Sequence, residues 1–243
     1  MTCEVVEVLR RSQQGITQPY ICRASSGDLY FVKGRGAGYS SLVKEWISAH
    51  LARRFGLALP DFAILHVSQE FQNQADGSWL FDLGSGLVFG SKALDAANEI
   101  SMLNVSVMDD DLKRDIVAFD LWIKNGDRTL SDQGGNPNIL WDARRERPYI
   151  IDHNLAFDEA VALPSLHSDH IFGAMLIELM NSRCLQVSFE KRFQRCLEDW
   201  NRILLELPDR WSFADDSRSV PTGFDLTKAL AVLRRFEIED MWK

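Results

Sequence analysis

Three acidic or amide side chains in the second half of the chain have types and positions that suit one kind of chemistry. Asp127 lies in a polar loop, Asn138 opens an apolar segment, and Asp152 ends the next apolar segment. If the two segments pair as a hairpin, these ends come together. Phosphoryl transfer needs such a set, because Mg²⁺ takes oxygen ligands while a separate carboxylate orients the attacking hydroxyl and accepts its proton. Asn138 and Asp152 suit the metal, and Asp127 suits the base.

A lysine and a glutamate in the first half of the chain extend this pattern. Lys33 ends the segment LYFVK (29–33), which is rich in strand-forming residues, and Glu45 lies in a stretch with helical spacing. Lys33 would bring a positive charge to nucleotide phosphates, and Glu45 would hold that lysine by an ion pair. Two solvated charges are the usual explanation for such a pair. The ordered set of five residues favours the functional interpretation.

The loop and hairpin residues also have structural explanations. Asp127 could form a turn with Arg128 as its partner, and Asn138 could close a turn of its own. Asp152 follows an apolar run, where a buried carboxylate would be costly without a partner or a metal, and this favours a functional role. One choice stays open. The insertion between Asp127 and Asn138 is long, so Asn136 competes with Asn138 as the metal ligand.

The residues up to Lys33 predict an antiparallel β meander. Three segments rich in Val, Leu and aromatic residues are separated by turn-forming links, and they are 4–10, 20–24 and 29–33. A helix is predicted over 39–56, and further strands over DFAILHV (61–67) and GLVFG (86–90). We therefore expect a nucleotide-binding N-terminal lobe at residues 1–90.

The second half of the chain is predicted to be mainly helical. Residues 110–124 combine an acidic start with an apolar stripe, which fits an amphipathic helix. Asp120 in this helix either braces the following loop or lies on the helix surface. A loop (125–137), two strands (NILWD and RPYIID) and helices over 169–182, 188–207 and 225–240 follow. We expect an α+β fold of two lobes, with an antiparallel sheet in the first and a mainly helical catalytic lobe at residues 91–243.

Composition limits the function classes. The chain has 243 residues, of which 46% are hydrophobic and 26% charged, as in globular proteins. Its net charge of -8 and its pI near 5.2 argue against broad nucleic-acid binding, which depends on clustered Lys and Arg. His167, Asp169 and His170 lack the spacing of a zinc site and predict a polar helix start. Zinc is therefore not predicted.

The cysteines and the N-terminus indicate a compartment. Four widely spaced cysteines form no CxxC pair, so we expect reduced thiols and a cytoplasmic protein. They are Cys3, Cys22, Cys184 and Cys196. No signal-peptide pattern is present at the start of the sequence, and the longest apolar runs are far shorter than about 18 residues. We expect a soluble protein that does not contact membranes.

The ordered set of motifs resembles the HipA-like serine/threonine kinase family, especially its compact members that lack extra N-terminal domains. The resemblance covers residues 30–157, over half of the chain. It is carried by YFVK (30–33), LVKEWISAHLARRFGLALP (42–60), VFGSKAL (88–94), FDLWIKNGDR (119–128), GNPNILW (135–141) and YIIDHNLAF (149–157). Single pieces such as GNPN occur by chance, whereas the ordered group is specific.

The resemblance implies a bilobal protein-kinase-like fold that binds ATP and Mg²⁺. Lys33 would contact ATP, Asp127 would be catalytic, and Asn138 with Asp152 would coordinate Mg²⁺. The segment with Phe89 and Gly90 would lie at the hinge, where backbone groups contact adenine. The turn RSQQGITQP (11–19), with Gly15, would cover the phosphates.

The chain departs from the protein-kinase pattern at three points. No GxGxxG precedes Lys33, the loop lacks an HRD triplet, and IDHN stands in place of DFG. The first departure puts phosphate binding in question, because Gly15 is the one glycine of that turn.

Three functions compete at this point. The first is a serine/threonine protein kinase, with Ser12 and Thr17 as candidate sites of autophosphorylation and a small antitoxin-like protein as a regulatory partner. The second is a kinase of metabolites or antibiotics, for which an acidic surface would suit cationic substrates. The third is a catalytically silent module that uses the kinase fold for binding. The presence of all four proposed functional residues argues against this third function; they are Lys33, Asp127, Asn138 and Asp152.

Overall fold

The computed structural model describes residues 3–12, 18–74, 77, 79–131, 134–215, 217–238 and 241–243. The chain forms two compact units, each made of segments that are separate in the sequence. The first contains Met1–Trp46, Pro60–Asp95 and Leu207–Phe224, and the second contains Ile47–Leu59, Ala96–Glu206 and Asp225–Lys243. The division into lobes at residues 1–90 and 91–243 stays a prediction.

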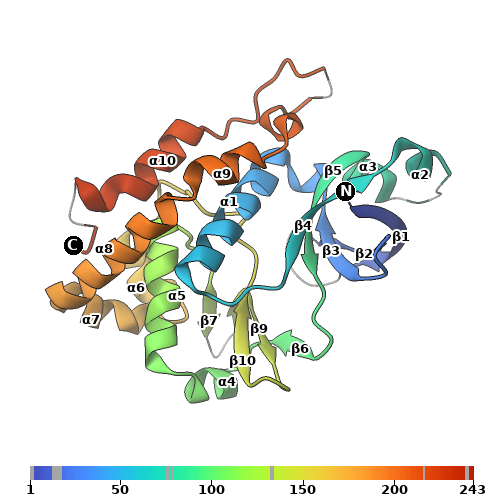
Figure 1. Ribbon diagram of the computed structural model, residues 1–243. Helices are drawn as coiled ribbons and strands as arrows, with labels where there is room; N and C mark the ends of the chain where they lie inside the picture. The colour runs from blue at the N-terminus through green and yellow to red at the C-terminus, as the bar shows by residue number, and fades with distance from the viewer. Residues whose placement is uncertain are drawn as a thin grey trace. The chain divides into compact units, whose positions relative to one another are not determined.

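Five strands of the first unit form a closed barrel (Figure 1). They are β1 (Cys3–Arg11), β2 (Tyr20–Ala24), β3 (Leu29–Lys33), β4 (Phe62–Val67) and β5 (Gly86–Lys92). Their order around the barrel is β1-β2-β3-β5-β4, and each neighbouring pair except β1 and β4 is antiparallel. The parallel pair places Cys3 opposite Leu65 and Glu4 opposite His66, which closes the barrel.

This closure corrects the prediction of a purely antiparallel sheet. The register between β1 and β2 shifts twice, between Val5 and Glu7 and between Val8 and Arg10. Bulges of this kind bend a strand and increase its twist. We attribute the approach of β1 to β4 to this bending, and the new pairing removes an exposed strand edge. A pattern of alternating side chains does not reveal such bulges, so the closure was not predicted.

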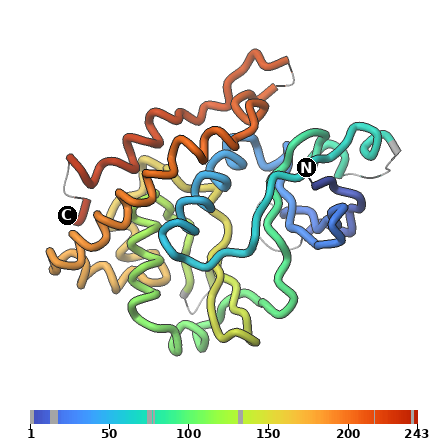
Figure 2. Tube along the Cα trace, in the orientation of Figure 1, coloured from blue at the N-terminus to red at the C-terminus, as the bar shows by residue number. Residues whose placement is uncertain are grey.

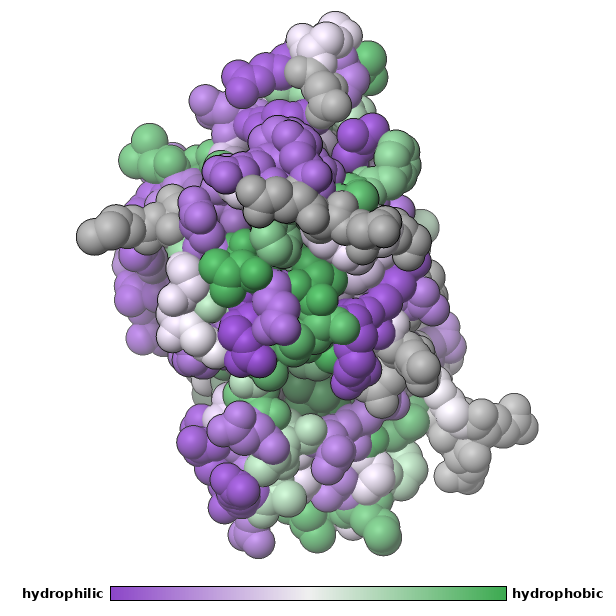
Figure 3. Space-filling view, turned by 90° about the vertical axis from the view of Figure 1, so that its right-hand side faces the viewer, coloured by the Kyte–Doolittle hydropathy of each residue, from purple (hydrophilic) through white to green (hydrophobic). Residues whose placement is uncertain are grey.

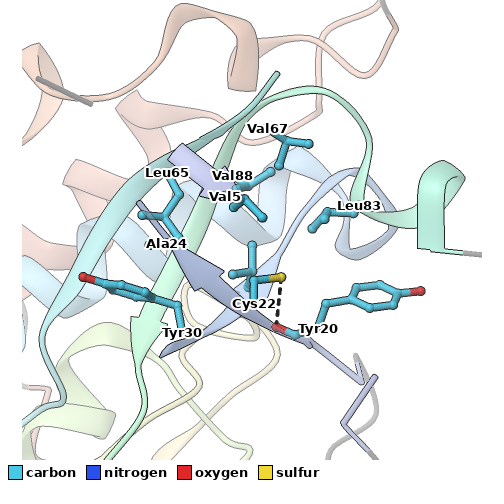
Figure 4. Packing of buried hydrophobic residues seen from close by; sticks show 10 residues of the cluster. Val5, Tyr20, Cys22, Ala24, Tyr30, Leu65, Val67, Leu83 and Val88 are labelled. Carbon is cyan, nitrogen blue, oxygen red and sulfur yellow. Dashed lines mark hydrogen bonds between the residues drawn. The ribbon is translucent and has the colours of Figure 1, made fainter. Parts of the chain in front are cut away.

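Buried side chains from all five strands fill the barrel (Figure 4). Cys22, Val32, Leu65 and Val67 have no exposed surface. The Cys22 thiol donates to the carbonyl O of Tyr20 at 3.8 Å. Burial raises the pKa of Cys22 to about 12, so this thiol stays protonated and serves as a small apolar group of the core.

A short turn and a long helix follow the lysine that ends β3. The turn is η1 (Arg35–Ala37), and the helix is α1 (Tyr39–Phe55), which ends one residue before the predicted Gly56. Gly34 before the turn is required by packing, because a Cβ there would lie 2.1 Å from the carbonyl O of Leu83. Leu83 belongs to α3 (Trp79–Leu83), which with α2 (Gln69–Gln74) lies between β4 and β5 and was not predicted.

The segment 207–224 joins the first unit although it comes late in the sequence (Figure 2). It contains η3 (Asp209–Ser212), where the Nε1–H of the fully buried Trp211 donates to the carbonyl O of Leu87 at 2.9 Å. The guanidinium of Arg210 lies 4.4 Å from the ring centre of Tyr39, at the start of α1. The helix that carries Glu45 is thus packed against a distant part of the chain.

The second unit contains a three-stranded sheet and a two-stranded hairpin. The sheet has the antiparallel order β10-β9-β6, with β6 (Ala97–Glu99), β9 (Ile139–Asp142) and β10 (Arg147–Ile150). The two strands predicted after the loop are therefore present and paired. The hairpin consists of β7 (Thr129–Ser131) and β8 (Gly134–Asn136), and it lies inside the segment predicted as a loop.

Helices form most of the remaining second unit. The predicted helix over 110–124 is present as α5 (Asp110–Ile123), and the Asp109 side chain caps its N-terminus. Two other predicted helices are interrupted in the structure. The segment 169–182 contains a non-helical turn near its start, and the segment 188–207 contains parts of two separate helices. Apolar spacing continues across such breaks because both sides pack on one core. The other elements are α4 (Met102–Val107), α6 (Leu163–Asp169), η2 (Gly173–Met175), α7 (Leu176–Asn181), α8 (Arg183–Leu197), α9 (Trp200–Leu205), α10 (Leu226–Arg234) and η4 (Arg235–Glu237).

Contacts with the C-terminal helices hold the end of α5. The ring of Phe193 in α8 stacks on Trp122, with centroids 4.6 Å apart. The Trp122 Nε1–H donates to the carbonyl O of Leu233 at 2.8 Å, and the buried Arg235 donates to the carbonyl O atoms of Trp122 and Leu121. These contacts fix the point from which the loop with Asp127 starts.

The surface combines polar and apolar regions. On the face that Figure 3 shows, apolar side chains gather near the middle and hydrophilic side chains surround them. Two exposed apolar side chains of β1, Val6 and Leu9, are 47% and 41% exposed. Across the described part of the chain, no helix is both long and apolar enough to cross a membrane.

The barrel core supplies a test of the fold. We expect Leu65→Ala to lower the free energy of unfolding by about 2–5 kcal/mol, because it leaves a cavity among side chains from all five strands. Urea denaturation followed by tryptophan fluorescence measures this change. Leu205→Ala is the control, since Leu205 is 87% exposed and its truncation should change stability by less than about 0.5 kcal/mol. Equal effects of the two substitutions would contradict the assigned core.

Candidate active site

In the first unit, a buried ion pair joins Lys33 at the end of β3 to Glu45 in α1. The Lys33 Nζ lies 2.5 Å from Glu45 Oε1, and both side chains are almost fully buried. This is the pair that the sequence predicted. A buried lysine needs such a counter-charge, and it needs a carboxylate on a rigid helix if its ammonium is to stay in one place. The role of Lys33 toward a nucleotide stays a prediction.

The two residues predicted to lie near adenine are in β5, beside Lys33. Phe89 is paired with Lys33 in the β3–β5 ladder and is buried, and Gly90 is paired with Val32. A Cβ at Gly90 would lie 2.7 Å from a methyl group of Leu65, so barrel packing accounts for the glycine. Gly15, predicted to approach the phosphates, lies outside the described residues.

Of the two candidate acceptor hydroxyls, that of Ser12 lies within the described residues. Ser12 is 7% exposed, and its backbone N–H donates to the carbonyl O of Pro19 at 2.8 Å. Phosphorylation of Ser12 would require that hydroxyl to leave its buried position. Thr17 lies outside the described residues.

In the second unit, Asp127 is held by two amide side chains. The Nδ2 atoms of Asn136 and Asn138 donate to Asp127 Oδ2 at 2.8 and 3.1 Å. Asn138 Nδ2 also donates to the backbone O of Asp127 at 3.1 Å. Because each amide turns its nitrogen toward Asp127, its carbonyl oxygen points elsewhere and is able to bind another group. The hairpin β7–β8 brings Asn136 to this position.

The environment of Asp127 changes its acidity. Partial burial raises the pKa of Asp127, and the nearby Asp152 charge acts in the same direction. The hydrogen bonds from Asn136 and Asn138 and the charge of Arg128 oppose this effect on the pKa. A carboxylate with a raised pKa accepts a proton more readily than a solvated aspartate.

Asn138 and Asp152 lie at corresponding ends of the paired strands β9 and β10. The backbone N–H of Ile151 donates to the carbonyl O of Asn138 at 2.9 Å, which ties the two ends together. Both residues have left-handed backbone conformations, with φ of 49° and 56°. The sequence-based expectation that a hairpin unites these residues is met. Whether Asn138 or Asn136 would bind a metal stays open, since both amides reach Asp127.

The donor set fits a magnesium ion that is also held by phosphate oxygens. Asn138 offers an amide oxygen and Asp152 a carboxylate, and Mg²⁺ is commonly held by one or two carboxylates, waters and substrate phosphates. No group of three or more His, Cys, Asp or Glu side chains within the described residues could hold a metal by itself. His167 and Asp169 of the cluster in the sequence are exposed, whereas His170 is buried.

Asp120 forms the centre of a buried network next to this loop. Its side chain is completely buried, so the interpretation as a helix-surface carboxylate is wrong. The Asp120 carboxylate accepts from Arg128 Nε at 2.6 Å, from His170 Nε2 at 3.0 Å and from Asn125 Nδ2 at 3.0 Å. Burial alone would raise the pKa of Asp120, yet Arg128 and His170 outweigh burial and hold this pKa well below its usual range. Asp120 is therefore a charged anchor for Arg128.

Sequence reasoning missed the roles of Arg128 and His170. The sequence allows Arg128 as a partner of Asp127, but in the structure its ion pair is with Asp120. His170 follows α6, and Ile171 next to it donates its N–H to the carbonyl O of Arg128 at 2.9 Å. A signal for the network exists in the sequence, because Asp120 is the one charged residue in the apolar run IVAFDLWI (116–123).

Comparison with known proteins now identifies the family. The family model for HipA-like kinases matches residues 5–243, nearly the whole chain. The chain belongs to the HipA-like kinase family. The resemblance inferred from the motifs is thereby confirmed. Among curated proteins no match to the sequence is found.

One solved structure similar to this HipA-like kinase is the proinflammatory kinase CtkA of Helicobacter pylori. The two are 10% identical in sequence, with a TM-score of 0.45. The alignment covers 98% of this chain and 93% of that chain. The mixed α and β architecture agrees with the predicted α+β class. Membership of the HipA-like kinase family supports a kinase-type phosphotransferase, for which a nucleotide and a divalent metal are generally required.

The buried histidine of this HipA-like kinase leads to a stability prediction. Burial lowers the pKa of His170, and the positive charge of Arg128 lowers it further. The hydrogen bond to Asp120 and the charge of Asp120 raise this pKa, but they do not outweigh burial. The unfolded chain therefore binds a proton near pH 6.5 that the folded protein does not, and stability should fall as the pH decreases below this value. We expect His170→Asn to cost about 1–3 kcal/mol at pH 7, because Asp120 loses a donor, and to make the loss of stability between pH 7 and 5 less steep.

Urea denaturation at a series of pH values measures both effects of His170→Asn. His167→Asn is the matched control, because His167 lies one turn earlier in α6 and is exposed. An unchanged pH slope in His170→Asn, or the same change in His167→Asn, would contradict the prediction.

Proposed function

We propose that this protein is an ATP- and Mg²⁺-dependent phosphotransferase that moves the γ-phosphate to a serine or threonine hydroxyl of a protein. The observation that carries the proposal is the arrangement around Asp127. Two amides orient its carboxylate, and Asp152 lies close enough to influence its acidity. A carboxylate for the hydroxyl proton and a separate pair of oxygen ligands are the two parts that phosphoryl transfer requires.

Each residue has a distinct role in this proposal. Asp127 orients the acceptor hydroxyl and takes its proton, while Asn136 keeps the carboxylate in position. Asn138 and Asp152 would hold Mg²⁺, which neutralises charge on the phosphates when it is bound. Lys33, held by Glu45, would bind the nucleotide phosphates.

Phe89, Gly90 and Gly15 are proposed to contact the nucleotide through their backbones. The backbone of β5 at Phe89 and Gly90 would meet the adenine, and the turn with Gly15 would lie over the phosphates. The pairing of Phe89 with Lys33 supports the placement of β5, whereas the proposal for Gly15, which lies outside the described residues, is supported by family membership alone. We further propose a cytoplasmic location, which is supported by four cysteines that form no disulfide.

Removal of the base tests the proposed function. We expect Asp127→Asn to lower the rate of phosphoryl transfer by about 10²–10⁴-fold, because an amide cannot accept the hydroxyl proton. ATP consumption with Mg²⁺ and mass spectrometry of protein substrates, including the enzyme itself, measure the transfer. Nucleotide binding and the melting temperature should change little, because the substitution keeps the size of the side chain.

Asp111→Asn is the control for this experiment. Asp111 is exposed on the first turn of α5 and pairs with Arg114, away from the loop residues that hold Asp127. Equal activity of wild type and Asp127→Asn would remove the catalytic role of Asp127. A wild-type protein that binds nucleotide but transfers no phosphate to any acceptor would instead favour a silent binding module.

A further inference from the structure

Arg128 directly follows the proposed base, yet its side chain is completely buried and forms its ion pair with Asp120. On one side its guanidinium meets Asp120, with Nε at 2.6 Å from Oδ2 and Nη2 at 3.4 Å from Oδ1. A buried guanidinium must be paired and hydrogen-bonded, because its desolvation is otherwise very costly. Asp120 supplies the counter-charge from the rigid helix α5.

On the other side the same guanidinium holds the backbone at both proposed metal ligands. Arg128 Nη1 lies 2.5 Å from the carbonyl O of Asn138 and 3.4 Å from that of Pro137. It also lies 3.5 Å from the carbonyl O of Ile151, the residue before Asp152. One planar group therefore connects the start of β9 with the end of β10, at the two positions that carry Asn138 and Asp152.

These two positions need support from their surroundings. Asn138 and Asp152 both have positive φ, a left-handed conformation that non-glycine residues adopt infrequently and that surrounding contacts can hold in place. The carbonyl O of Asn138 accepts both from Arg128 Nη1 and from the Ile151 N–H. Arg128 thus contacts the backbone where the two left-handed residues are joined.

The hydrogen bonds of two histidines complete the network. His170 Nδ1 accepts from the N–H of Phe172 at 3.0 Å, so in a neutral ring the proton lies on Nε2, which donates to Asp120. His153 Nε2 lies 3.4 Å from Arg128 Nη2 and accepts from it. With His170 donating, Asp120 is surrounded by donors and keeps Arg128 in one orientation. A buried network in which the carboxylate and the guanidinium are paired and hydrogen-bonded in this way restricts the orientation of both groups.

We propose that Arg128 is a positioning residue that sets the spacing and orientation of Asn138 and Asp152 as a pair of metal ligands. The proposal rests on the proposed function, since it assigns a purpose to the pair that would hold Mg²⁺. Arg128 itself touches neither nucleotide nor metal in this scheme. Its fork of N–H groups binds a carboxylate and backbone carbonyls at once, which a lysine ammonium on a flexible stem does not reproduce.

Metal binding in Arg128→Lys tests the proposal. Titration with Mn²⁺ in the presence of a non-hydrolysable ATP analogue, followed by the electron paramagnetic resonance signal of free Mn²⁺, gives the metal affinity without turnover. We expect Arg128→Lys to bind Mn²⁺ about 10–100-fold more weakly than wild type, the usual effect of losing a partner that orients metal ligands. The melting temperature of each variant is measured in parallel.

Arg192→Lys is the matched control. Arg192 also joins a carboxylate of α5 to a backbone carbonyl, since it contacts Asp115 at 2.5 and 2.8 Å and the carbonyl O of Phe55 at 3.0 Å. Its contacts involve none of the residues of the loop or of the metal pair. We expect unchanged Mn²⁺ affinity in Arg192→Lys. An equal loss of affinity in both variants would show a general effect on stability and overturn the proposal.

A second variant covers the case in which Arg128→Lys does not fold. His170→Asn keeps an acceptor at the place of Nδ1 for the Phe172 N–H and removes the Nε2 donor to Asp120, so the ion pair with Arg128 survives but is less firmly oriented. We expect a smaller weakening of Mn²⁺ binding in the same direction. Wild-type affinity in a folded Arg128→Lys, or in His170→Asn when only that variant folds, overturns the proposal and leaves the proposed function intact. If the wild-type protein binds no Mn²⁺ with the nucleotide analogue, the proposed function fails and this inference fails with it.

Discussion

The ion pair between Asp120 and Arg128 is the interaction on which the arrangement of the second unit's site depends. Both side chains are completely buried, so neither is tolerated without the other. Asp120 is part of α5, whose C-terminal end is held by Trp122 and Arg235 through contacts with the last helices of the chain. The position of α5 therefore fixes Arg128 through Asp120, and Arg128 in turn fixes the backbone at Asn138 and Ile151 through its hydrogen bonds. In this way the helical core positions a loop that has little core of its own.

The first unit uses the same physical device with the charges in a different place. Lys33 ends a barrel strand, and Glu45 from α1 holds it in a buried pair. In both units a cation is placed by a carboxylate on a helix that is well packed along its length. The two cations differ in their other partners, since Lys33 is proposed to bind nucleotide phosphates whereas Arg128 donates to backbone carbonyl groups. A buried cation with a carboxylate partner thus marks a potential binding group in one case and a structural support in the other.

Much of the fold could be predicted because it depends on local patterns. The strands β2 and β3, the helices α1 and α5 and the pair β9–β10 follow from strand propensity, helical spacing and turn residues. The barrel closure could not be predicted, because it depends on bulges in β1 and on pairing between Cys3 and Leu65, residues far apart in the sequence. The hairpin β7–β8 was missed for a related reason. Its strands are short and polar, and they lack the alternation that identifies a strand.

The sequence by itself determined the family, the pairing of Lys33 with Glu45 and the meeting of Asp127, Asn138 and Asp152, because residue type and order along the chain carry that information. Only the tertiary structure decided that Asp120 is buried and that His170 and Arg128 are its partners. An apolar helix shows which of its positions face the core, but it does not show which residue from another segment will meet a charge there. Tertiary packing determines that partner, because a buried charge must be paired and only the folded chain brings a suitable residue within hydrogen-bonding distance.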